Sequence, residues 1–248
     1  MIFRRTIIAA LFVGFLAGLV LSIAQIISVN PIIFKAETFE VAEEHTHASQ
    51  TLAEEVWAPE DGRERSVYTI LANASAGVGY AAILLALMSQ LQLQGLTRMS
   101  LPKGIAWGAA GFLVFFVAPG IGLPPEIPGV EAAPIQHRQY WWLFAVIATG
   151  LGLLMLGFAP VKWKLLGLPL IVLPYLVGAP HSEGPTFAHP DPEVLATLTH
   201  LHQQFIFASG ASNLLFWIVL GVASSWALNA WVLKGIQPAG VDGEPINA

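Results

Sequence analysis

The sequence of 248 residues contains no cysteine and few charged side chains. Without thiols the chain has no disulfide, thiolate ligand or iron–sulfur cluster, so any metal must be held by imidazole, carboxylate, backbone oxygen or water. Charged residues make up 11% of the chain, whereas an ordinary soluble domain has about 25%. The net charge of −5 provides no polybasic surface, so no nucleic-acid partner is expected. No GxxxxGK motif followed by Ser or Thr is present, which excludes ATP hydrolysis by a P-loop.

Long uncharged apolar runs dominate the chain, and 55% of its residues are apolar. Runs of about 20 such residues predict membrane spans. We expect an all-α polytopic membrane protein with one integral membrane domain over residues 1–234, a partly helical outer loop at 30–66 and a short polar tail at 235–248. A signal peptide is the alternative for the first run, but that run exceeds the usual 7–15 apolar residues. The six predicted spans are residues 6–29, 67–93, 104–123, 140–159, 161–179 and 205–233.

The fifth span is the shortest. Its core, residues 165–179, rises about 22 Å, which is less than the hydrocarbon thickness of about 30 Å. It also contains two prolines, which bend a helix and free carbonyl groups. Residues 161–164 restore the length if Lys162 and Lys164 extend to the interface and Trp163 anchors there. The alternative is a re-entrant segment, which leaves five spans.

Alternate threading of six spans places every histidine, and every acidic residue except Asp242 and Glu244, in connections on one face. Because basic residues favour the cytoplasmic side, we expect an inner-membrane protein with both termini in the cytoplasm and the histidines outside. Most basic residues lie on the cytoplasmic face, namely Arg4, Arg5, Arg98, Lys103, Lys162, Lys164 and Lys234, against Lys35, Arg63, Arg65 and Arg138 outside.

The first outer connection carries the acidic segment Glu43-Glu44-His45-Thr46-His47. Imidazole and carboxylate are suitable ligands for divalent first-row metals. On a helix, Glu44 and His47 can share an ion whereas His45 and His47 cannot, and on an extended segment the two histidines share a face. Residues 34–56 read as one helix or two short ones. A solvated acidic loop with incidental histidines is the alternative.

The third outer connection, residues 180–204, contains four histidines and neither Lys nor Arg. Asp191-Pro192-Glu193 predicts a helix start, which puts His200 and His202 where the last span begins. They either receive a cation from the loop or lie as an interfacial pair in the headgroups. The candidate metal ligands are His45, His47, Glu44, His181, His189, His200 and His202.

The predicted spans contain polar residues but no obvious ion-coupling charge, which argues against a buried carboxylate relay. Asn73, Ser209 and Asn213 either line a cation path or hydrogen-bond between helices. Two glycine pairs put small residues on one helical face and predict close helix packing. These pairs are Gly14-x-x-x-Gly18 and Gly104-x-x-x-Gly108.

Four stretches resemble the CbtA family of probable cobalt transporter subunits, over nearly the full length. The resemblance implies a multi-span inner-membrane protein, not an enzyme, that imports Co²⁺ for cobalamin biosynthesis with a small one-span CbtB partner and no tightly bound cofactor. The stretches are Phe3-Arg4-Arg5, Glu44-His45-x-His47, Pro124-Pro125-Glu126-x-Pro128-Gly129 with Arg138-Gln139-x-Trp141-Trp142, and Gly178-Ala179-Pro180.

These observations favour the membrane component of a divalent transition-metal uptake transporter, in contact with lipid, whose outer histidines and carboxylates capture the cation. Two alternatives remain open. One is a membrane redox subunit, although haem ligation usually uses histidines within helices and no histidine lies inside a predicted span. The other is a non-transporting scaffold or metal sensor.

In the proline-rich middle connection, we expect Arg138 to pair with an outer acid.

Overall fold

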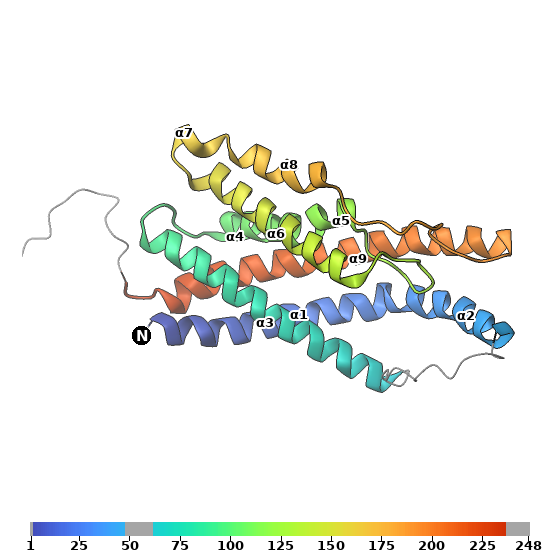
Figure 1. The fold of residues 1–248 in the computed structure, drawn as a ribbon. Coiled ribbons are helices and arrows are strands. Elements are labelled where there is room, and N and C mark those ends of the chain that lie inside the picture. Colours follow the sequence, from blue (N-terminus) through green and yellow to red (C-terminus); the bar gives the residue numbers. More distant parts are fainter. Residues whose placement is uncertain (1, 48–61, 237–248) are drawn as a thin grey trace, which may run out of the picture. The chain divides into compact units, whose positions relative to one another are not determined.

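The computed structural model describes residues 2–47 and 62–236, which are helical apart from connecting segments and one isolated bridge (Figure 1). In these ranges five helices are long and apolar enough to cross a bilayer. A helix satisfies its own backbone hydrogen bonds, as hydrocarbon demands, and the predicted all-α polytopic class is confirmed. The five are α1 (Ile2–Ser28), α3 (Arg63–Leu93), the run of α4 (Leu101–Phe112), η1 (Leu113–Val117) and α5 (Ala118–Gly122), α6 (Ile135–Phe158), and α9 (Pro192–Ala227) with η2 (Leu228–Val232).

The chain forms two compact units that differ in chemistry. All seven histidines belong to the second unit, as does every acidic residue except Asp242 and Glu244. Histidines and carboxylates therefore gather in one unit, although that unit also contains Lys162 and Lys164 of the opposite predicted face, and the single membrane domain stays a prediction. The first unit comprises residues 1–22, 65–111 and 214–248, and the second comprises residues 23–64 and 112–213.

The first helix stops at Ser28 and the chain restarts as α2 (Asn30–His47) after one residue. Pro31 lies in the first turn of α2, where its missing N–H costs nothing because no helical acceptor is available there. The amides of Ile32 and Ile33 bond instead to the carbonyl of Val29, at 3.0 and 3.2 Å. A helix was expected in this outer loop, and α2 confirms it up to His47. The part of the prediction that covers residues 48–56 lies outside the described residues.

In the first unit, α1 and α3 cross with their backbones almost in contact. A Cβ atom at Gly18 would lie 2.6 Å from the Cα of Ala74. A Cβ at Gly77 would meet the carbonyl oxygen of Gly14. Because lipid tails are as apolar as leucine side chains, such close backbone approach is a main source of helix association in membranes. The Gly14-x-x-x-Gly18 pair is confirmed as a packing motif.

The second glycine pair forms a similar crossing between α4 and α9, also in the first unit. A Cβ at Gly104 would lie 2.9 Å from the carbonyl oxygen of Gly221, and one at Gly108 would lie 3.0 Å from the Cα of Ile218. Next to this crossing, Trp217 and Phe216 are buried and pack edge-on at 5.5 Å between ring centroids. Both predicted glycine motifs therefore hold helices of one chain together.

The beginning of α1 lies against the end of η2. The guanidinium of Arg5 donates to the carbonyl oxygens of Trp231 and Lys234, at 3.4 and 3.2 Å. Carbonyls at a helix C-terminus lack helical donors and carry partial negative charge, so a cation there is favourable. The two ends of the membrane region are thus adjacent, and an odd number of crossings would separate them.

The fifth apolar stretch, residues 161–179, forms two short helices rather than one, and whether it crosses the membrane stays a prediction. The chain forms α7 (Val161–Lys164), breaks at residues 165–166 and continues as α8 (Gly167–Val177). The eleven residues of α8 rise about 17 Å. The break lies where Gly167 packs against Gly152 of α6, with a notional Gly167 Cβ 2.5 Å from the Gly152 oxygen. Backbone contact at this point fixes where α8 begins.

Although short, α8 runs antiparallel to α6 in the second unit. Its first residue packs against Gly152, and further along the Nε1 of Trp141 donates to the carbonyl of Pro174 at 3.3 Å. The hydroxyl of Tyr175 donates to the carbonyl of Ala118 in α5 at 2.8 Å. After α8 the chain therefore leaves beside the N-terminal end of α6.

We predict that Gly77→Ala lowers the free energy of unfolding by about 1–3 kcal/mol, because the new methyl group forces α3 away from α1. Gly79→Ala is the matched control on the same helix, since nothing lies within 4 Å of its notional Cβ. It should change stability by less than about 1 kcal/mol. Reversible unfolding of both variants in detergent micelles measures the difference. Equal losses would contradict the close crossing.

Candidate cation-binding cap

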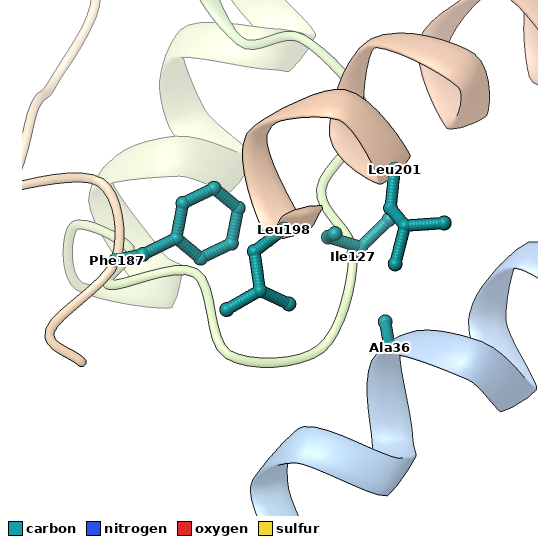
Figure 2. Packing of buried hydrophobic residues seen from close by; sticks show 5 residues of the cluster. All are labelled: Ala36, Ile127, Phe187, Leu198 and Leu201. Atoms are coloured by element: carbon teal, nitrogen blue, oxygen red, sulfur yellow. The ribbon is translucent and has the colours of Figure 1, made fainter. Parts of the chain in front are cut away.

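Three connections that are far apart in the sequence meet in one apolar cluster of the second unit (Figure 2). Ala36 comes from α2, Ile127 from the connection between α5 and α6, and Phe187 from the segment after α8. Leu198 and Leu201 come from the first turns of α9. We call residues 30–47, 123–134 and 178–205 the cap. Partly buried side chains surround the cluster, namely Ile32, Phe39, Val130, Val194, Leu195 and Phe205.

Burial of these side chains stabilises the cap. All five cluster residues are at most 7% exposed, and full burial of one large apolar side chain contributes about 1.5–3 kcal/mol. Backbone pairing adds to this, because Val130 and Phe187 form a bridge and the amide of Glu131 donates to the carbonyl of Thr186 at 3.1 Å. The turn before the bridge uses Gly129 at φ 85°, where a side chain would be strained. The parts of the predicted outer connections that form the cap are thus packed together.

His202 is the histidine that the cap holds most firmly. It is half-buried, its Nε2 lies 3.0 Å from the carbonyl oxygen of Pro125, and Phe187 packs edge-on to its ring at 5.9 Å between centroids. A carbonyl oxygen only accepts hydrogen bonds, so Nε2 must carry a proton here. In the neutral imidazole, the ring lone pair is then on Nδ1.

In His189 the other ring nitrogen, Nδ1, makes the hydrogen bond, and it does so as an acceptor. Its Nδ1 accepts a hydrogen bond from the amide of Asp191 at 3.0 Å, so a neutral ring carries its proton on Nε2. The side chain of Asp191 in turn accepts from the amide of Glu193 at 2.8 Å. This is an N-cap contact, and the helix start predicted at Asp191-Pro192-Glu193 is confirmed. His189 also lines a small pocket of the cap beside Phe39 and Leu198.

The other candidate ligands are separate from His189 and His202. His181 and His200 are exposed. Among the side chains that the structure describes, those of residues 2–39 and 62–236, no three of His, Asp or Glu are close enough to hold one metal ion. The backbone of α2 is helical through His47, so the extended alternative for the His45 segment is wrong. The side chains of Glu44, His45 and His47 lie outside the described part of the chain.

Helix α9 corrects one detail of the sequence analysis. His200 and His202 lie within the apolar run from Pro192 to Val232, whereas every histidine was expected outside the spanning helices. That run is much longer than the roughly 20 residues a bilayer requires. Because Leu198 and Leu201 pack in the cap cluster, the first turns of α9 belong to the cap.

The polar residues proposed to line a path make helix contacts. Asn73 donates to the hydroxyl of Ser22 at 3.1 Å, which joins α3 to α1 in the first unit. Asn213 donates to the carbonyl of Ser209 on its own helix at 3.0 Å. Bonds between helices, such as that of Asn73, hold membrane helices together. A similar contact joins α1 to α9 in the second unit, where the hydroxyls of Ser28 and Ser212 are 3.2 Å apart.

An ion pair braces the proline-rich connection of the cap. The guanidinium of Arg138, at the start of α6, pairs with the carboxylate of Glu126, and both side chains are mostly buried. The expected pairing of Arg138 with an outer acid is confirmed. The sequence analysis missed Phe187 and the carbonyl of Pro125 as partners of His202. No local pattern signals a backbone oxygen 77 residues away.

We predict that Glu126→Gln lowers the free energy of unfolding by about 1–2 kcal/mol, because it leaves the mostly buried Arg138 without its counter-charge. Glu131→Gln is the control in the same connection, since Glu131 is exposed. It should cost less than about 0.5 kcal/mol. Thermal unfolding of the purified variants tests this. If Glu126→Gln is as stable as the wild type, the ion pair does not brace the cap.

A family model described as "Probable cobalt transporter subunit (CbtA)" matches residues 3–229, a range that includes the cap and nearly all of the five long helices of the described chain. No match was found among curated proteins or solved structures. The description is that of a transport component rather than an enzyme, and the word subunit implies partner proteins in a complex. Together with its membrane-spanning helices, this match shows that the chain belongs to the CbtA family of probable cobalt transporter subunits.

Proposed function

We propose that this chain is the membrane component of a cobalt uptake transporter and that the cap captures the divalent cation on the outer face. The observation that carries the proposal is the hydrogen bond from His202 Nε2 to the carbonyl of Pro125. Metal-ligating histidines usually donate their other ring N–H to a carbonyl or carboxylate, which fixes the tautomer and the ring orientation. His202 has this arrangement, so Nδ1 is the proposed ligand atom.

The capture site that we propose is weak and transient. One imidazole with water as the remaining ligands binds Co²⁺ far less tightly than a closed site of several protein ligands, and a transported ion must also be able to leave. Acidic residues of the cap raise the local cation concentration. His45, His47, Glu44, His181, His189 and His200 are further proposed contributors, each offering one ligand along the surface of the cap.

The proposed orientation puts the cap outside the inner membrane and both termini in the cytoplasm. The excess of basic residues at the opposite ends of the spans supports it. The contact of Arg5 with the carbonyl of Lys234 supports an even number of crossings. Since five helices are long enough to cross, the α7–α8 segment is the sixth crossing in this topology.

Beyond the cap, the proposed route of the ion uses neutral oxygen and amide groups. Asn73, Ser209 and Asn213 are candidates, and the two asparagines donate their helix contacts through Nδ2, whereas a cation would bind their Oδ1 atoms. A small one-span subunit of the CbtB type is the proposed partner in the complex. No tightly bound cofactor is proposed, and Co²⁺ is the cargo.

We predict that His202→Gln lowers cobalt uptake about tenfold or more at limiting cobalt, since it removes the imidazole ligand. The glutamine amide can still donate to the carbonyl of Pro125, so the cap should keep its stability. His137→Ala is the control, because His137 is exposed at the start of α6 and is not a candidate ligand. Cobalt accumulation is measured in cells that express each variant with the presumed partner, at equal protein levels.

Two results would contradict the proposal in different ways. Unchanged uptake by His202→Gln would remove this histidine from cation capture. If cells accumulate the same cobalt with and without the wild-type chain while the purified protein still binds metal, the chain is a scaffold or sensor. A visible haem spectrum of the purified protein would instead favour the redox subunit.

A further inference from the structure

The turn between α6 and α8 exposes apolar and basic side chains together. Val161 is 88% exposed and Leu165 is 73% exposed, and both lysines of α7 are also exposed. Trp163 is half exposed, and the Nζ of Lys162 lies 5.7 Å from the centroid of its ring. Such a surface is unfavourable in water and suits the boundary between acyl chains and headgroups.

The lysines of this turn have no acidic residue near them in the sequence. Residues 132–182 contain neither Asp nor Glu. In the described part of the chain, no ion pair joins Lys162 or Lys164 to a carboxylate. Two other basic groups near helix ends differ, because Arg5 donates to helix carbonyls and Lys103 donates to the hydroxyl of Thr97 at 2.7 Å. Two positive charges are therefore available to an anionic ligand.

The start of α8 fixes the position of this turn. Gly167 packs backbone to backbone on Gly152, where a notional Gly152 Cβ would lie 2.7 Å from the Gly167 oxygen. Since α8 rises only about 17 Å, the turn must lie near the hydrocarbon boundary or the bilayer must thin around it. Contact between the lysines and headgroup phosphates relieves this mismatch.

We propose that the α7 turn, residues 160–166, is a binding site for the headgroups of anionic phospholipids. Lys162 and Lys164 contact the phosphates, Trp163 lies at the interface, and Val161 and Leu165 enter the acyl region. Each lysine near an anionic membrane surface strengthens association by about fivefold. The bound lipid holds the short α8 at its depth in the membrane.

The test uses the full chain in nanodiscs of phosphatidylcholine alone or of an equal mixture with phosphatidylglycerol. Native mass spectrometry counts the phosphatidylglycerol that the protein retains, and thermal unfolding reports the stabilisation by that lipid. The double variant Lys162→Gln with Lys164→Gln should retain at least about fivefold less phosphatidylglycerol and lose the stabilisation. The double arginine variant at the same positions should behave like the wild type.

A matched control removes two basic residues elsewhere on the same predicted face, Lys103→Gln with Lys234→Gln, and should retain the lipid. Equal retention by the α7 glutamine variant and the wild type would overturn the proposal. Equal losses in the α7 variant and the control would also overturn it, because the effect would then follow net charge. Unfolding in pure phosphatidylcholine shows that each variant is folded.

Discussion

The apolar contact among α2, the 123–134 connection and the first turns of α9 is the interaction on which the cap depends. Phe187 packs in this cluster and also faces the ring of His202. Pro125, which accepts the hydrogen bond from His202, lies two residues from the buried Ile127. The orientation of the imidazole is therefore a consequence of apolar packing and does not require a preformed metal site.

The two units differ in composition and in helix packing. The first unit has close glycine crossings and no histidine, and Arg5 joins its two chain ends. The second unit contains the histidines, nearly all carboxylates and the short α8.

Local patterns predicted much of this structure. Apolar runs gave the long helices, and Asp191-Pro192-Glu193 marked the start of α9. The break between α7 and α8 was not predictable, because it coincides with a backbone contact to Gly152 of α6 that no local pattern signals. The π-helical turn η1 was also missed. The amide of Ala118 bonds to the carbonyl of Leu113 five residues back, just before Pro119 disrupts the regular helix.

One measurement tests the central claim, that the cap faces outward and the α7 turn faces the cytoplasm. Because the chain has no native cysteine, single cysteines can be placed at His181 and at Lys164 and labelled with a membrane-impermeant maleimide. The account predicts that in intact cells His181→Cys is labelled and Lys164→Cys is labelled only after the membrane is opened. Labelling of both positions from the same side, or the reverse pattern, would contradict it.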